Sequence, residues 1–151
     1  MAYVGASRPP AECIFCSALQ RGDDHASLIL HRGTHSFLIL NAFPYASGHL
    51  MAVINRHVSS VIDATTEELA EAIGLVRLSV QALDAEYKAH GFNIGLNQGR
   101  VAGAGIEGHL HIHVVPRWQG DSNFMPVIGD VRVLPESLDV TWDRLRGRFH
   151  G

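Results

Sequence analysis

The stretch His109-Leu110-His111-Ile112-His113-Val114 alternates a histidine with an aliphatic residue three times. Alternation with a period of two is typical of a β-strand, and it places the three imidazoles on one face, at intervals of about 6.5 Å. The aliphatic side chains point to the opposite face, where they can be buried. Because imidazoles are costly to bury without partners, the pattern indicates either metal ligation or histidine-based catalysis at this strand.

A glycine-rich segment over residues 98–108 precedes the histidine strand and contains Gly99, Gly103, Gly105 and Gly108. Such loops are often only turns, but their open backbone N–H groups can also cradle phosphate oxygens. A neutral imidazole can attack phosphorus and form a nucleotidyl-histidine intermediate, while neighbouring imidazoles stabilise the phosphoryl oxygens. Since the usual histidine pKa is about 6.5, the neutral form is available at physiological pH. The loop and the strand together favour phosphate chemistry.

The motif Cys13-Ile14-Phe15-Cys16 has the spacing of two zinc ligands, and a tetrahedral site needs two more. His57 and His109 are candidates for those two positions. Two reduced thiols without a metal are the alternative. A thioredoxin-type redox pair is less favoured, because we do not expect this motif to open a helix after a β-strand.

Composition sets further bounds on the class of protein. The 151 residues are 46% hydrophobic and carry a formal net charge of −3. These values suit one soluble globular domain with a sizeable core, and the lack of a basic excess argues against non-specific nucleic-acid binding. The first residues show no signal-peptide pattern, and no apolar run is long enough to span a membrane. We therefore expect a cytoplasmic protein with a loose leader over residues 1–12.

The remaining patterns predict an α+β domain. We expect strands over residues 27–31, 37–40, 49–54, 92–96 and 109–114. Thr65 and Glu68 have the spacing of a capping box at the start of a long helix, and Gly91 lies where that helix is expected to stop. The apolar stripe of this helix is predicted to comprise Leu69, Ile73, Val76, Val80, Leu83 and Tyr87. Short connections favour antiparallel pairing, so we expect a five-stranded antiparallel sheet crossed by one long helix, with a short C-terminal helix within residues 142–149.

These motifs together resemble the histidine-triad (HIT) superfamily of nucleotide hydrolases and transferases. The family pattern His-φ-His-φ-His-φ-φ, in which φ is apolar, is met by residues 109–115. The Cys13 to Cys16 motif, Gly48-His49, His57 and residues 92–105 are similar to further family motifs, so the resemblance covers residues 13–118. Residues 118–127 resemble a subgroup that includes bacterial diadenosine tetraphosphate phosphorylases and related hydrolases. The resemblance implies a homodimer with sheets joined across the interface, and a tail over residues 119–151 that packs on the domain or on the partner subunit.

The resemblance also implies a role for each histidine of the triad. His111 would be the nucleophile on the α-phosphorus, and His113 would hydrogen-bond the phosphates and assist the leaving group. His109 would orient the site and share in a zinc centre with Cys13, Cys16 and His57. Four protein ligands leave no open coordination position, so this zinc would be structural. No organic cofactor is implied.

Nucleotide-binding roles are implied for a second set of residues. Asn41 would bind the ribose hydroxyls, Asn97 would reach the phosphates, and His49 would lie behind the triad. The phosphate loop would include Gly103, Ala104 and Gly105, where many relatives have a Gln or Ser side chain. Residues expected near the base are Ile39, Ala42 and Phe43.

The activity that the resemblance implies is two-step cleavage of a dinucleoside polyphosphate, most directly diadenosine tetraphosphate. His113 at the third triad position, where the uridylyltransferase-like branch has Gln, favours the hydrolase and phosphorylase branches. Whether water or phosphate is the acceptor stays open. Alternatives are a hydrolase of nucleoside phosphoramidates or aminoacyl-adenylates, a nucleotide-binding signalling protein with little turnover, and a metal-binding module.

Overall fold

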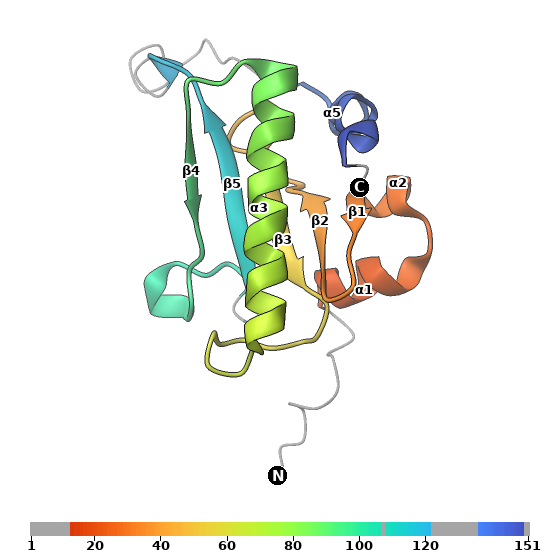
Figure 1. Ribbon diagram of the computed structural model, residues 1–151, viewed down its shortest axis with the longest axis vertical. Helices are drawn as coiled ribbons and strands as arrows, with labels where there is room; N and C mark the ends of the chain where they lie inside the picture. The colour runs from red at the N-terminus through yellow and green to blue at the C-terminus, as the bar shows by residue number, and fades with distance from the viewer. Residues whose placement is uncertain (1–12, 107, 122–135, 150–151) are drawn as a thin grey trace.

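The computed structural model describes residues 13–106, 108–121 and 136–149 and contains one five-stranded antiparallel sheet (Figure 1). The strand order is β1-β2-β3-β5-β4, so the histidine strand pairs with β3 on one side and β4 on the other. The strands are β1 (Ile29–Arg32), β2 (Ser36–Leu40), β3 (Leu50–Ile54), β4 (Gly91–Gly95) and β5 (His111–Arg117). This confirms the predicted α+β class. The expected leader and part of the expected tail lie outside the described residues.

The long helix α3 (Thr66–Tyr87) begins as predicted. The Thr65 side chain accepts from the backbone N–H of Glu68, and the Glu68 carboxylate accepts from the backbone N–H of Thr65, so the capping box is complete. The predicted stop at Gly91 is wrong. The helix ends instead at Lys88, which adopts the left-handed conformation with φ 55°. Gly91 is already the first residue of β4, where it pairs with Arg117.

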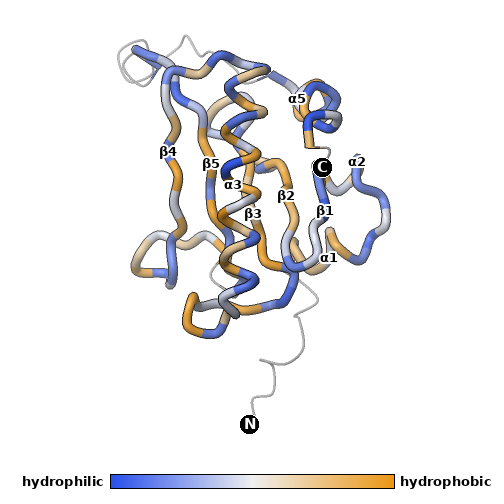
Figure 2. Tube along the Cα trace, viewed as in Figure 1, coloured by the Kyte–Doolittle hydropathy of each residue, from blue (hydrophilic) through white to orange (hydrophobic). Residues whose placement is uncertain are grey.

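Helix α3 covers one face of the sheet (Figure 1). Five of the six residues of the predicted stripe are buried or pack against the core, namely Leu69, Val76, Val80, Leu83 and Tyr87. Ile73 is the exception, since it is 58% exposed. The helix residues that are buried are Glu68, Ala72, Leu75, Val76, Ser79, Ala82 and Leu83. Small residues at the contact let the helix lie close to the sheet, and the Ser79 hydroxyl is satisfied by the Leu75 carbonyl. Figure 2 shows the most continuous apolar colouring in the central strands β2 and β3.

The opposite face of the sheet packs against the N-terminal helix α1 (Ile14–Arg21), which is followed by the short helix α2 (Asp24–Ser27). Neither helix was expected from the sequence. Cys13 is the N-cap of α1, and its thiol accepts from the backbone N–H of Cys16. The cysteine motif therefore opens a helix, but no strand precedes this helix in the described part of the chain, so the strand-then-helix setting of a thioredoxin-type pair is not found there.

The C-terminal helix α5 (Leu138–Leu145) lies on the β1 side of the sheet, near α2 (Figure 1). It begins four residues before the predicted segment because Ser137 caps it by accepting from the backbone N–H of Val140. The Trp142 indole N–H donates to the Ile29 carbonyl at 2.9 Å, which ties α5 to β1. Short 3-10 turns occur at η2 (Arg100–Ala102) and η3 (Arg146–Arg148). Over the described ranges, no helix combines the length and apolarity that crossing a bilayer requires.

Candidate active site and metal centre

A cavity of about 780 Å³ opens on the sheet face that carries α1. His113, Met51, Ile39 and Ile29 lie in cross-strand register, so they form a row over four adjacent strands from β5 to β1. At the usual strand spacing this row is about 14 Å long. Expected site residues that line the cavity are Ile39, Asn41, Ala42, Phe43, Asn97, Gly103, Gly105, His111 and His113. The structure thus brings together most of the predicted nucleotide site.

The tautomer of His111 follows from its hydrogen bond. Its Nδ1 lies 2.8 Å from the backbone carbonyl of His109, and a carbonyl can only accept, so Nδ1 carries the proton. The other ring nitrogen, Nε2, then carries an unshared electron pair. Burial lowers the pKa of His111, and the bond to the His109 carbonyl opposes this shift only in part. The His111 ring therefore stays neutral even at pH values somewhat below the ordinary pKa of histidine, and its Nε2 is available as a nucleophile.

His113 has the complementary tautomer, which is set by His49. The backbone N–H of Tyr45 donates to His49 Nδ1 at 3.1 Å, so the proton of neutral His49 lies on Nε2. That atom is 2.9 Å from His113 Nδ1 and donates to it, which leaves the proton of neutral His113 on its own Nε2. Burial lowers the pKa of His49 to about 4 and keeps this ring neutral. His49 is buried behind His113 and does not line the cavity.

The glycine-rich loop is shaped by two glycines with positive φ, Gly99 with φ 89° and Gly103 with φ 96°, of which Gly103 is in the left-handed helical conformation. The Asn97 amide donates to the Gly103 carbonyl at 3.5 Å, which links the expected phosphate residue to the loop. Ala104 does not line the cavity. It is buried, and its backbone N–H donates to the Gly99 carbonyl at 3.2 Å, so this N–H is used within the loop. Of Ala104 and Gly105, only Gly105 lines the cavity.

The four expected metal ligands come together in one cluster. One ligand atom from each of Cys13, Cys16, His57 and His109 lies within 4.8 Å of all the others. His109 Nε2 donates to the Ile54 carbonyl at 2.6 Å, so its Nδ1 is unprotonated and faces the cluster. This Nδ1 is 3.3 Å from the Cys13 sulfur and 3.2 Å from His57 Nδ1. Tetrahedral zinc places such atoms about 3.3 to 3.6 Å apart, so the donor set fits zinc in both chemistry and geometry.

Titration of the cluster agrees with a cation site. Burial lowers the pKa of His109 to about 4 and lowers that of His57, so both imidazoles are neutral and can act as ligands. Burial and the neighbouring Cys13 raise the pKa of the Cys16 thiol to about 12. Without a cation the Cys16 proton is therefore retained at neutral pH, and a bound metal would displace it.

Phe15 lies between the metal cluster and the triad. Its fully buried ring is 5.3 Å from the His109 ring and 5.1 Å from the His111 ring, measured between centroids. Since Phe15 is on α1, between the two cysteines, any displacement of the cluster would move a side chain that packs on His111. The cavity and the cluster are therefore parts of one packed unit.

The sequence did not reveal the wall of the cavity that α1 and α2 supply. Lining residues that were not anticipated there include Ile14, Phe15, Ala18, Ser27 and Leu28. The spacing of Ile14, Ala18 and Arg21 along one side of a helix was the available signal, but it spans only two turns. Met51 was missed as well, although its alternation with Val53 places both on the triad's face of the sheet.

Known proteins have this architecture. A model of the HIT domain matches residues 23–120. The AP-4-A phosphorylase of Mycobacterium tuberculosis is 43% identical over 115 residues. The matched region covers 76% of this chain but only 59% of the length of that relative. A hypothetical histidine triad nucleotide-binding protein from Sulfolobus tokodaii has a TM-score of 0.73 at 26% identity, with 90% of this chain and 91% of that chain covered. A zinc-bound histidine triad family protein from Mycobacterium smegmatis shares the fold, with a TM-score of 0.72 at 22% identity over 91% and 92% of the two chains. Because the match to the HIT domain model covers well over half of the residues of this chain, the chain belongs to the HIT domain family.

Proposed function

We propose that this protein cleaves dinucleoside polyphosphates, with diadenosine tetraphosphate as the first substrate to test. The observation that carries the proposal is the pair of complementary tautomers in the cavity. His111 presents an unshared pair on Nε2, and the ring of His113, 4.9 Å away between centroids, presents an N–H on Nε2. A nucleophile beside a hydrogen-bond donor suits phosphoryl substitution, because the donor stabilises charge on the phosphoryl oxygens and the leaving group. The AP-4-A phosphorylase relative supports the choice of substrate.

In the first step, His111 Nε2 would form a bond to the α-phosphorus, and the bond to the bridging oxygen would break. His113 would donate a hydrogen bond from its Nε2–H to the departing polyphosphate and so stabilise the charge that develops there, while keeping its proton. In the second step, water or phosphate would attack the same phosphorus, the N–P bond would break, and its electron pair would return to His111 Nε2. Any proton that the acceptor loses would pass to solvent. Asn97 and Gly105 would contact the phosphates, and Asn41 the ribose.

We also propose that the Cys13, Cys16, His57 and His109 cluster holds a structural zinc ion. The fit of the donor set supports this, and a zinc-bound protein of the same fold is known. Zinc would supply a rigid cross-link with no open coordination position. The residues of this chain would then fix α1, and with it Phe15, against the ring of His111.

We further propose a homodimer that forms along β4. This strand is an edge of the sheet, and Ile94 is 50% exposed on it, while Val101 in the adjacent turn is fully exposed. An open strand edge with exposed apolar side chains favours pairing with a second chain. Sedimentation should give twice the 16.5 kDa chain mass, and Ile94→Lys should shift it toward one chain. A wild-type mass of one chain would exclude the dimer.

The acceptor can be identified with one experiment. We expect the wild-type protein to consume diadenosine tetraphosphate, and product chromatography with and without inorganic phosphate to show which acceptor is used. ADP and ATP that form only with phosphate would establish a phosphorylase, whereas AMP and ATP without phosphate would establish a hydrolase. If the nucleotide binds but neither product pair forms, cleavage is refuted in favour of a binding protein.

A further inference from the structure

We propose that Glu136 is a positioning residue for the triad, because it fixes the turn that makes His113 a hydrogen-bond donor. The inference rests on the proposed function, since it concerns the N–H that His113 would offer to the phosphates. It gives the C-terminal arm, defined here as residues 136–149, a part in the chemistry, although no residue of this arm lines the cavity.

The donor of His113 depends on the backbone of the turn over residues 45–49. The Tyr45 N–H donates to His49 Nδ1, so the His49 proton lies on Nε2 and is donated to His113 Nδ1. If the Tyr45 N–H moved away, His49 could carry its proton on Nδ1, and its Nε2 would become an acceptor. His113 would then place its own proton on Nδ1 to donate to His49. Its Nε2 would present an electron pair to the phosphates in place of an N–H.

The turn is closed by a bond of its own and packs directly on the end of α3. The His49 N–H donates to the Ala46 carbonyl at 3.1 Å, and Gly48 has a φ of 91°. A Cβ atom at Gly48 would lie 2.8 Å from Leu83 Cδ2 and 3.5 Å from Tyr87 Cε2, so there is room only for glycine. The place of the turn, and with it the Tyr45 N–H, therefore depends on what holds the Tyr87 ring.

Glu136 acts on this turn in two ways. Its backbone N–H donates to the Ser47 hydroxyl oxygen at 2.9 Å, across 89 residues of sequence. Its carboxylate accepts from the hydroxyl of Tyr87, whose ring packs on Gly48. One residue thus ties the turn at Ser47 and also fixes the ring against which the turn rests.

The Glu136 carboxylate is itself held by further donors. The Thr141 hydroxyl donates to Oε1 at 2.7 Å, and Arg144 Nη1 donates to Oε2 at 2.6 Å. The Arg144 guanidinium also lies 4.1 Å from the centroid of the Tyr87 ring. Charge-assisted hydrogen bonds are stronger than neutral ones, and a fully paired network of this kind is rigid. Glu136 therefore has a fixed position between α3 and α5.

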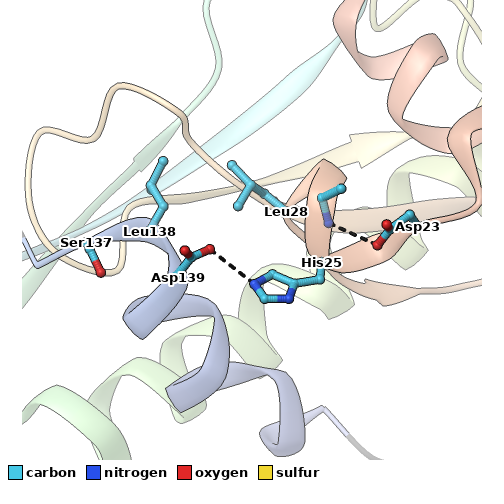
Figure 3. A pocket seen from close by; sticks show the side chains of 7 residues that line it. Asp23, His25, Leu28, Ser137, Leu138 and Asp139 are labelled. Atoms are coloured by element: carbon cyan, nitrogen blue, oxygen red, sulfur yellow. Dashed lines mark hydrogen bonds and ion pairs between the residues drawn. The ribbon is translucent and has the colours of Figure 1, made fainter.

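Helix α5 is anchored a second time on α2, across a hollow of about 580 Å³ (Figure 3). His25 and Asp139 point toward one another there, with 3.1 Å between Nε2 and Oδ1. The His25 ring also stacks on Trp142 at 4.1 Å with an interplanar angle of 6°. Because α2 forms part of the cavity wall, the C-terminal arm joins this wall to the turn behind His113.

Ser47→Ala tests the inference, because it removes the acceptor of the Glu136 N–H and Ser47 does not line the cavity. NMR of the histidine ring nitrogens should show the Nε2–H tautomer of His113 as the main form in the wild type and as a minor form in the variant. The kcat for diadenosine tetraphosphate should fall about tenfold while KM changes by less than about twofold, because the variant weakens a donor whose complete removal typically costs about 100- to 1,000-fold in kcat. Ser47→Thr keeps the hydroxyl and should restore both the tautomer and kcat.

The matched control is Thr65→Ala, which removes a hydrogen-bonded hydroxyl at the far end of α3 from Tyr87. Loss of this helix cap should lower the Tm at least as much as Ser47→Ala does, and should leave the His113 tautomer and kcat unchanged. A wild-type tautomer in Ser47→Ala would overturn the inference, and so would an altered tautomer with unchanged kcat. If the wild type cleaves no diadenosine tetraphosphate, the proposed function fails, whereas the tautomer in Ser47→Ala still decides whether Glu136 positions His113.

Discussion

Replacement of His111 by asparagine is expected to lower the turnover of diadenosine tetraphosphate by about four to six orders of magnitude, the range observed when an enzymatic nucleophile is removed. The introduced side-chain amide has no nitrogen that can attack phosphorus. It can still donate an N–H to the His109 carbonyl, which His111 Nδ1 contacts at 2.8 Å, so the fold should be retained. Initial rates, together with the Tm and the metal content of the variant, provide the measurement.

The metal content decides between the two interpretations of the histidine strand. His111 is not among the four clustered ligands, so zinc should be retained in His111→Asn at the wild-type ratio. Zinc that is lost together with turnover would mean that the triad is itself a metal site, and the assignment of His111 as nucleophile would fail. Turnover within tenfold of the wild type would refute it directly. His31→Asn is a suitable control, because His31 is a histidine on β1 that does not line the cavity.

The double substitution of Cys13 and Cys16 by serine is expected to abolish stoichiometric zinc binding and to lower the Tm by about 10 °C or more. Zinc coordination by a folded site contributes several kcal/mol, and each kcal/mol corresponds to about 2 to 4 °C in a domain of this size. Serine is a good N-cap, so the start of α1 should survive at position 13. Elemental analysis and thermal unfolding measure the two effects.

Chelation supplies the matched comparison for the cysteine variant. Wild-type protein stripped of metal should unfold near the same temperature as the double variant, and chelator should not lower the Tm of the variant further. Turnover should fall in both samples, because Phe15 packs on His111 from the helix that the cluster anchors. Unchanged metal content in the variant would show that the metal site is elsewhere or absent.

Local sequence patterns predicted the helices and strands that have a regular alternation of apolar residues or a helix-capping motif. The alternation at residues 109–114 predicted the interior strand β5, although this strand runs from His111 to Arg117 and His109 lies just before it. Thr65 with Glu68 predicted the start of α3. The apolar stripe of α3 was predicted correctly except at Ile73, which is apolar but faces solvent, while the small residues Ala72 and Ser79 are buried at the contact and were not predicted. Hydrophobicity alone does not show that a close helix–sheet approach needs small side chains.

The sequence predicted the residues of the candidate site only where they belong to a recognisable motif. Cys13, Cys16, His57 and His109 come together as expected. The cysteine spacing indicated two ligands, and the resemblance to histidine-triad proteins implied His57 and His109 as the other two. The wall formed by α1 and α2 could not be predicted in this way. Helix α2 has four residues, so it is too short to show a helical period in the sequence.

The position of β5 in the sheet has a consequence for biosynthesis. Residues 111–117 pair with β3 from earlier in the chain and separate it from β4, although β4 precedes β5 in sequence. During synthesis, β3 therefore has an open edge until the histidine strand emerges, and α5 reaches β1 later still through Trp142. Pairings between distant segments slow folding. The nascent chain can therefore complete its nucleotide cavity only after the histidine strand has been synthesised, because His111 and His113 are its last lining residues in the described part of the chain.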